Sequence, residues 1–182
     1  MRIIFIRHGA TKGNLEKRYI GITDEELSAE GINKLKKTTY PHGDKIIVSA
    51  MKRCIQTAHI IYPDREYIIN EDLRECNFGI FENKSYEDLK DNKLYKDWLN
   101  SGGKTGFPEG ESRQEFSARC CSAFICAVNT YSHCESLVFV VHGGTIMAIL
   151  EKYHISKKDF YSWQIKNGEF SELKFENGAL SF

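Results

Sequence analysis

Two histidines in this chain stand at the ends of apolar segments, and each is followed by glycine. His8 comes after residues 3–6 and Arg7, and His142 comes after residues 137–141. An imidazole acts as a nucleophile or as a hydrogen-bond donor, and a guanidinium binds phosphate oxygens through its fork of N–H groups. Two histidines beside an arginine are therefore suited to phosphoryl transfer at a phosphate dianion.

The apolar segments before the histidines have the length and composition of buried strands. In an open parallel sheet the ligand crevice lies beyond the carboxyl ends of the strands, so both imidazoles should project toward one substrate. A third segment, residues 45–48, leads to Arg53 and into a helical stretch. We therefore expect Arg53 to reach the rim of the same pocket.

Gly143 is expected to bind the same anion through its backbone. It follows His142 directly, and without a side chain it lets the main chain approach a ligand closely. A helix that begins there would present its first N–H groups to a phosphate. An ordinary turn residue is the alternative interpretation of Gly143, as it is of Gly9 and Thr11.

The alternation of short apolar segments with stretches of helical period predicts an α/β fold. We expect three layers, α/β/α, around a mostly parallel central sheet, because parallel strands need helices on both faces. Residues 170–175 and 179–182 should form a closing hairpin around Asn177 and Gly178. The other predicted strands are residues 3–6, 45–48, 67–69 and 137–141.

Capping patterns mark the predicted helix starts. The segment from Ser112 has the form of a capping box, and the apolar residues after it recur at helical period, which predicts a helix over residues 112–131. Short helices are predicted after Ser85 and Ser156 on the same pattern. Residues 100–111 are rich in glycine and indicate a loop over or beside a site.

Length and charge narrow the function classes. The 182 residues predict one domain, residues 1–182. Lys and Arg together number 25, as do Asp and Glu, so no strong net field should draw the protein to nucleic acid or anionic lipid. No apolar run approaches the roughly 18 residues of a membrane span, and residues 3–6 are too few for a signal peptide.

The six cysteines show neither the spacing of a zinc site nor the density of a disulfide scaffold. This pattern indicates the reducing cytoplasm as the compartment. We therefore expect no structural metal and no membrane or nucleic-acid partner. The sequence leaves the oligomeric state open.

Residues 7–14 resemble the R-H-G-x-T-x-x-N opening of the histidine phosphatase superfamily, which is also called phosphoglycerate-mutase-like. Ala10 and Asn83 depart from the family pattern, in which Glu and Gly are common at these positions, and we expect them to affect substrate choice more than activity. The resemblance covers nearly the whole chain. Its further blocks, in the family's order, are residues 21–31, 49–58, 73–79, 107–112 and 142–144.

The resemblance implies a mechanism without metal ion or cofactor, in which His8 attacks phosphorus and becomes a phosphohistidine. Arg7, Arg53 and His142 would hold the phosphoryl oxygens, and Asn14 would add an amide contact. The attack needs a neutral imidazole, and the neighbouring arginines should lower the pKa of His8.

Glu75 matches the general acid of the family and is expected to protonate the leaving alkoxide, then to activate water. Cations lower the pKa of a carboxyl group, whereas burial and an approaching phosphate dianion raise it, so the sequence leaves the protonation of Glu75 open. A solvated loop carboxylate is the alternative. Tyr19, Tyr86, Trp98 and Phe107 are candidates either for the leaving-group side of the site or for the core.

These residues, with the resemblance, predict a phosphatase that hydrolyses small phosphorylated metabolites. A phosphoglycerate mutase is the alternative, because it would share every catalytic residue, but the compact segment between Glu75 and His142 favours hydrolysis. The small size of the chain and residues 78–89 and 108–112 make it similar to the α-ribazole 5′-phosphate phosphatases of cobalamin biosynthesis. A phosphomonoesterase of broad specificity is the alternative for the substrate.

Three other functions fit the sequence less well. Residues 142–144 resemble an oxyanion-hole segment of a serine hydrolase, but the chain has no G-x-S-x-G motif. Residues 101–105 resemble a phosphate-binding loop, but Trp98 stands where that motif needs its first glycine. A non-enzymatic phosphoprotein-binding module of the same fold would not need catalytically competent side chains. This chain has them at all five predicted catalytic positions, which are Arg7, His8, Arg53, Glu75 and His142.

Overall fold

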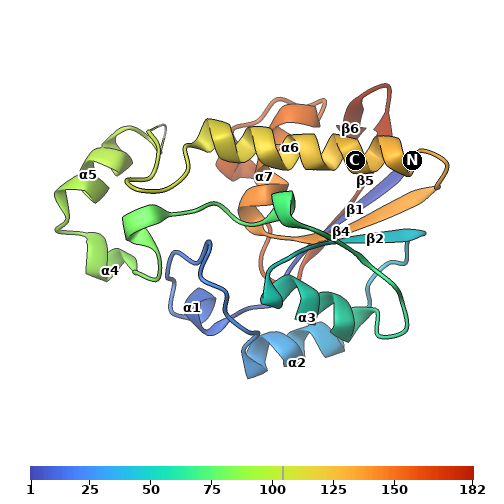
Figure 1. The fold of residues 1–182 in the computed structure, drawn as a ribbon, viewed down its shortest axis with the longest axis horizontal. Helices are drawn as coiled ribbons and strands as arrows, with labels where there is room; N and C mark the ends of the chain where they lie inside the picture. Colours follow the sequence, from blue (N-terminus) through green and yellow to red (C-terminus); the bar gives the residue numbers. More distant parts are fainter. Residues whose placement is uncertain (104) are drawn as a thin grey trace.

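The computed structural model describes residues 1–103 and 105–182. Within them, six strands form one sheet in the order β3-β2-β4-β1-β5-β6 (Figure 1). Strands β1 to β4 are parallel, and β5 and β6 are antiparallel to their neighbours. The prediction of a mostly parallel sheet is confirmed. The strands are β1 (Arg2–Arg7), β2 (Lys45–Ser49), β3 (Ile68–Asn70), β4 (Ser136–Val141), β5 (Phe170–Glu176) and β6 (Ala179–Ser181).

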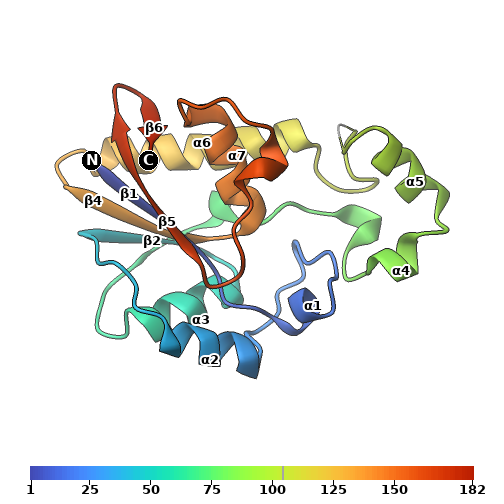
Figure 2. The ribbon, with the colours of Figure 1, turned by 180° about the vertical axis from the view of Figure 1, so that it is seen from behind.

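Helices cover both faces of the sheet, as predicted (Figures 1 and 2). Helices α6 (Arg113–Thr130) and α7 (Gly143–Tyr153) lie on one face, and α2 (Ala29–Lys37) and α3 (Lys52–Ile61) lie on the other.

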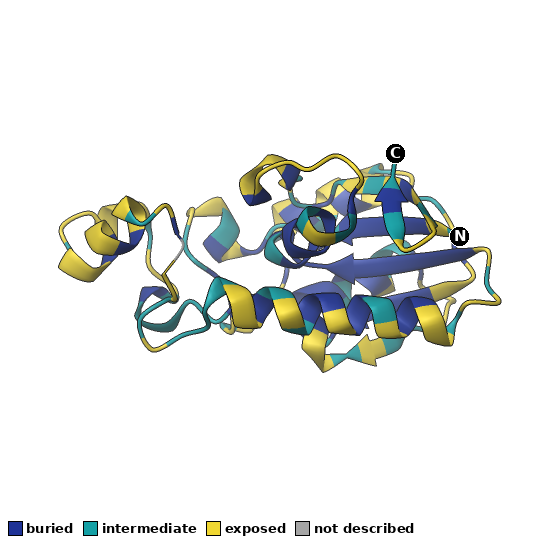
Figure 3. Cartoon of the chain, turned by 90° about the horizontal axis from the view of Figure 1, so that it is seen from above, coloured by how far each residue is buried: buried dark blue, intermediate teal, exposed yellow. Residues whose placement is uncertain are grey.

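Side chains alternate between the two faces along β1. Ile3 and Phe5 join the apolar cluster that contains residues of α6 and α7, whereas Ile4 and Ile6 join the cluster with α2 and α3. Every residue of β4 is buried, which explains why its sequence is almost continuously apolar (Figure 3). Each such side chain contributes about 1.5–3 kcal/mol by its burial.

Two of the three capping patterns start a helix. Ser112 caps α6 with a full capping box, and Ser85 does the same for the short helix α4 (Tyr86–Leu89). The Ser156 pattern, after which a short helix was predicted, does not cap a helix. The N–H of Ile155 donates to Leu180 O of β6, which holds the chain extended there, and a 3₁₀ helix forms further along, at Phe160–Trp163 (η3).

The predicted closing hairpin is confirmed by β5 and β6 and by the turn between them. Asn177 and Gly178 both have positive φ, 51° and 79°, as the tight turn requires. Asn83 also has a positive φ, of 58°. Glycine adopts this left-handed conformation without strain, and asparagine tolerates it better than most residues, which accounts for the substitution at this position.

A helical extension projects from the sheet end that lies beyond β1 and β4 (Figure 1). It contains α4 and α5 (Lys93–Asn100), and it has an apolar cluster of its own that includes Phe81, Tyr95 and Trp98. The glycine-rich loop predicted at residues 100–111 follows α5, and its Lys104 lies outside the described residues.

Short elements complete the chain and were not predicted. Helix α1 (Lys12–Leu15) begins after a capping box at Thr11. Two 3₁₀ helices, Glu71–Leu73 (η1) and Gly79–Phe81 (η2), flank residues 74–78, which form neither helix nor strand. In the described part of the chain, no helix has the length and apolar character needed to cross a bilayer.

Candidate active site

The two histidines meet at the ends of adjacent strands. Arg7 pairs with Val141 in the parallel register of β1 and β4, so the next residues of both strands, His8 and His142, lie side by side. Their ring centroids are 5.1 Å apart, at an interplanar angle of 64°. Both rings are almost completely buried, with 3% of His8 and 0% of His142 exposed.

The hydrogen bond of His8 assigns its tautomer. Nδ1 lies 2.7 Å from the carbonyl oxygen of Gly9, and a carbonyl oxygen only accepts hydrogen bonds. Nδ1 therefore carries the proton, and Nε2 keeps its lone pair. This is the state that a nucleophilic imidazole needs.

Burial and charge keep His8 neutral. Burial is the larger cause that lowers the pKa of His8 well below 6.5, and the charges of Arg53 and Arg7 lower it further. The sequence had indicated the arginines alone. The pKa of His142 is also well below 6.5; burial is the largest cause, and the charge of Arg53 is the next.

His142 is held by two polar side chains. The Nε of Arg53 donates to Nδ1 of His142 at 3.3 Å, so the imidazole proton is on Nε2, which lies 2.8 Å from Oγ of Ser49 and donates to it. Ser49 had no predicted role of its own, although it ends β2, the strand beside β4. Its position at the end of a strand next to β4 was the one sequence feature that could have indicated this role.

Arg53 lies beneath the site and not at its rim. Its side chain is fully buried, Nη1 donates to the carbonyl oxygen of Thr23 at 2.9 Å, and Nη2 donates to that of Gly21 at 2.8 Å. The structure differs from the expected rim position because the guanidinium of Arg53 extends inward, where it donates to His142 and to two backbone carbonyl groups.

Glu82 fixes the carbonyl groups that Arg53 contacts. Its carboxylate accepts hydrogen bonds from the N–H groups of Gly21, Ile22 and Thr23 and from the Thr23 hydroxyl. This residue belongs to the F-G-x-x-E segment of the sequence, but no role was predicted for it. The carboxylate orders residues 21–23, and these in turn hold the guanidinium beside His142.

Arg7 lines a cavity of about 630 Å³. Its Nη1 donates to Ile165 O at 2.7 Å, and its buried Nε has no hydrogen-bond partner among the described residues. The guanidinium packs closely over Gly143: a Cβ there would lie 3.1 Å from Cζ of Arg7. Gly143 also lines the cavity, which agrees with a backbone approach to a ligand.

Glu75 lines the same cavity, and its carboxylate lies against the amino end of α7. Its Oε2 accepts the N–H of Gly144 at 3.1 Å, and its Oε1 accepts the N–H of Cys76 at 3.0 Å. A Cβ at position 144 would collide with Oε1, so this close approach requires glycine. One of the helix N–H groups expected to bind a phosphate therefore binds the Glu75 carboxylate.

Burial is the largest influence on the pKa of Glu75. It raises the pKa of the carboxyl group from 4.5, and it outweighs the two backbone hydrogen bonds and the charges of Arg53 and Arg7, which lower the pKa. The sequence had left this balance open. A buried carboxyl group with a raised pKa is suited to donate a proton.

Asn14 lines the cavity, and its side chain is hydrogen-bonded to that of a second asparagine, Asn167. Its Oδ1 accepts the Thr11 N–H at 3.2 Å and Nδ2 of Asn167 at 3.1 Å. Asn167 also donates to the carbonyl oxygen of His8 at 3.2 Å. No sequence signal marked Asn167, because it lies in the irregular segment before β5.

Seven aromatic residues contribute to the cavity wall. Three of the four aromatic candidates line it, but Tyr86 is 57% exposed and stands outside the described lining. Trp98 is 7% exposed, and its indole N–H is buried without a partner among the described residues. The predicted loop contributes to the wall with Gly102, Gly103 and Phe107. The aromatic lining residues are Tyr19, Phe78, Trp98, Phe107, Phe116, Phe160 and Tyr161.

Comparison with known proteins shows which family this sequence matches. The family model described as histidine phosphatase superfamily (branch 1) matches residues 3–182. An adenosylcobalamin/alpha-ribazole phosphatase of Escherichia coli (strain K12) is 29% identical over 160 residues, which is 84% of this chain and 78% of that protein.

Two solved structures show the same fold. The alpha-ribazole phosphatase from Shigella flexneri has a TM-score of 0.85 at 24% identity, and the match covers 100% of this chain and 94% of that one. A phosphoglycerate mutase from Thermus thermophilus has a TM-score of 0.76 at 25% identity, with 100% and 97% covered.

Proposed function

This chain belongs to the histidine phosphatase superfamily, and we propose that it is a phosphatase that hydrolyses phosphomonoesters of small molecules through a phosphohistidine at His8. The observation that carries the proposal is the state of His8: a neutral imidazole, with its proton on Nδ1 and a free lone pair on Nε2, beside a cavity that Arg7 lines. The reaction needs no metal ion and no cofactor, because the arginines supply the positive charge.

In the first step, Nε2 of His8 attacks phosphorus and the bond from phosphorus to the ester oxygen breaks. Arg7 and Arg53 stabilise the charge on the phosphoryl oxygens, and Asn14 adds an amide contact. His142 exchanges its bond with Ser49 for a phosphoryl oxygen when substrate binds, and its Nε2–H becomes the donor.

Glu75 supplies the proton that the leaving alkoxide needs. Its raised pKa supports a protonated carboxyl group at the start of the reaction. In the second step the resulting carboxylate takes a proton from water as that water attacks phosphorus, and the phosphorus–nitrogen bond breaks. Inorganic phosphate leaves, the lone pair returns to His8, and Glu75 is protonated again.

For the substrate we propose α-ribazole 5′-phosphate, within a class of small phosphorylated metabolites. Two observations support it: the names of the Escherichia coli and Shigella proteins, and an aromatic cavity wall that suits a flat apolar leaving group. A phosphomonoesterase of broad specificity is the alternative. A panel of phosphorylated metabolites separates the two, since kcat/KM for α-ribazole 5′-phosphate should exceed that for simple sugar phosphates.

Phosphoglycerate mutase activity is the second candidate, because the fold is shared with a phosphoglycerate mutase from Thermus thermophilus. Incubation with 3-phosphoglycerate distinguishes the two functions. A phosphatase releases inorganic phosphate, whereas a mutase forms 2-phosphoglycerate without net release.

Two further assignments are part of the proposal. All six cysteines lie in the described residues and each is a free thiol, which supports action in the reducing cytoplasm. Residues 1–182 act as one catalytic domain. Phosphate release from p-nitrophenyl phosphate, with and without EDTA, tests the activity first: we expect hydrolysis that the chelator does not change.

A further inference from the structure

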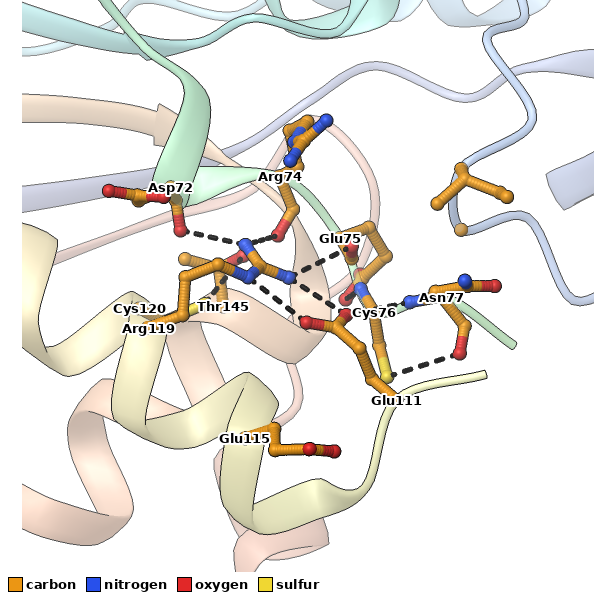
Figure 4. A network of polar contacts seen from close by, with 12 residues as sticks. Asp72, Arg74, Glu75, Cys76, Asn77, Glu111, Glu115, Arg119, Cys120 and Thr145 are labelled. Atoms are coloured by element: carbon orange, nitrogen blue, oxygen red, sulfur yellow. Dashed lines mark hydrogen bonds and ion pairs between the residues drawn. The ribbon is translucent and has the colours of Figure 1, made fainter. Parts of the chain in front are cut away.

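The ion pair of Arg119 and Glu111 lies outside the cavity lining and is hydrogen-bonded to the segment that carries Glu75 (Figure 4). Arg119, on α6, directs its guanidinium at backbone carbonyl groups on the amino side of that residue. Nη1 donates to the carbonyl oxygens of Asp72 at 2.8 Å and Arg74 at 3.1 Å, and Nη2 lies 3.5 Å from that of Glu75 itself. One side chain thus contacts three carbonyl groups of the segment.

Glu111 completes the grip on the carboxyl side. It accepts two parallel hydrogen bonds from Arg119, from Nε at 3.1 Å and from Nη2 at 2.9 Å. Its Oε2 also accepts the N–H of Asn77 at 2.9 Å, and its own N–H donates to the carbonyl oxygen of Asn77 at 2.9 Å. The pair therefore holds the chain both before and after Glu75.

The segment needs such support because no regular structure fixes it. Residues 74–78 form neither helix nor strand, so no ladder of backbone hydrogen bonds orients Glu75. The side chains of Arg119 and Glu111 are only 18% and 24% exposed, and a partly buried bidentate pair is stiffer than an ordinary surface ion pair. Helix α6, capped and packed on the core, provides a rigid base for it.

We propose that Arg119 and Glu111 are positioning residues for Glu75, which hold its carboxyl group between the Gly144 N–H and the leaving-group oxygen of a substrate. This inference rests on the proposed function. Neither side chain touches the reacting atoms. Their loss should displace the general acid and leave His8 and the phosphoryl-binding groups in place.

The leaving group provides the readout. Phenoxide, whose conjugate acid has a pKa of about 10, needs protonation as it leaves, whereas 2,4-dinitrophenoxide leaves without it. The two esters carry rings of similar size, so both fit the same aromatic wall. Because kcat/KM reports the steps up to departure of the leaving group, the change in the ratio of the two values from wild type to variant measures the loss of proton donation.

The test compares Arg119→Met and Glu111→Gln with the wild-type enzyme on phenyl phosphate and 2,4-dinitrophenyl phosphate. We expect kcat/KM to fall about 10²-fold for phenyl phosphate and to stay nearly unchanged for the dinitrophenyl ester. Arg119→Lys, which keeps the charge without the fork, should lose an intermediate amount. Arg65→Met is the matched control, because Arg65 also donates to backbone carbonyls, those of Gly43 and Asp44, in a loop away from the cavity.

A double variant tests whether the pair acts through Glu75. Adding Arg119→Met to Glu75→Ala should cause no further loss on phenyl phosphate, since the residue being positioned is already absent. Equal losses on both esters, unchanged kinetics in both single variants, or additive losses in the double variant would overturn the inference. A wild-type enzyme that releases phosphate from neither ester would instead overturn the proposed function. If Arg119→Met does not fold, as judged by circular dichroism, Glu111→Gln decides the outcome.

Discussion

The candidate site has two ends that are built in different ways. At the phosphate end, His8 and His142 follow the neighbouring strands β1 and β4. They and Arg53 are buried next to Arg7 and Gly143, which line the cavity. At the leaving-group end, Glu75 stands on irregular chain, and the aromatic side chains of the wall come from loops, α5, η3 and the start of α6. In the proposed mechanism, the sheet therefore positions the groups for phosphoryl transfer, and less regular segments position the general acid and the wall for the leaving group.

This difference gives the two ends separate signatures in kinetics. A change at the phosphate end should affect every substrate alike, because all of them transfer the same group. A change at the leaving-group end should affect substrates according to the acidity, the shape and the polar atoms of the group that departs. The predictions below test that separation.

The largest effect is expected for His8→Ala. The variant lacks the nucleophile, so kcat/KM should fall by about 10⁴-fold or more for every ester, whatever its leaving group. Phosphate release from phenyl and 2,4-dinitrophenyl phosphate measures this, and a thermal melt establishes that the variant folds. A loss confined to one of the two esters would place His8 at the wrong end of the site.

Glu75→Gln should divide the same two esters. The amide keeps the shape of the side chain but donates no proton to a departing oxygen, so kcat/KM for phenyl phosphate should fall about 10³-fold. The value for 2,4-dinitrophenyl phosphate should change little. An equal loss on both esters would mean that Glu75 belongs to the phosphate end.

The pH dependence of kcat/KM should show one limb from each end. His8 must be neutral, and its pKa is well below 6.5, so protonation reduces the rate tenfold per pH unit only below that lowered pKa. Glu75 must be protonated, and its pKa is raised from 4.5, so the rate falls as the pH rises above that raised pKa.

The phosphate ester itself titrates near pH 6, so a variant is needed to assign the alkaline limb. Glu75→Gln should remove the limb that Glu75 causes and leave the acid limb in place. An alkaline limb that is identical in the variant would show that the substrate and not Glu75 titrates there.

The smallest effect is expected for Trp98→Phe. Trp98 lines the cavity, and its buried indole N–H has no partner among the described residues, so we expect it to donate to an acceptor on the leaving group once substrate binds. KM for α-ribazole 5′-phosphate should rise about fivefold, the value of one hydrogen bond, while kcat/KM for phenyl phosphate should not change. Tyr86→Phe, at an exposed ring outside the described lining, is the control.

The phosphate end could largely be predicted from the sequence. Residues 3–6 and 137–141 are apolar because both faces of their strands are covered, and this local signal places a histidine at each strand end. The depth of Arg53 and the roles of Ser49 and Glu82 could not be predicted, because they depend on contacts between segments far apart in the chain.

The leaving-group end was less accessible to sequence analysis. The grip of Arg119 and Glu111 on residues 72–77 joins α6 to irregular chain, and neither residue has a local pattern that shows it. The failure of the Ser156 pattern to cap a helix has a similar cause: pairing of Ile155 with β6 outweighs the local capping pattern. Tertiary contacts decide the conformation where short-range signals are weak.

The central claim is that His8 carries the phosphoryl group between the two steps. Mass spectrometry of the Glu75→Gln variant, quenched in base after reaction with 2,4-dinitrophenyl phosphate, tests it most directly, because this variant should form the intermediate but hydrolyse it slowly. We expect one added phosphoryl group on the peptide that contains His8. A phosphoryl group on a different residue, or dinitrophenol release with no phosphorylated enzyme at any time, would contradict it.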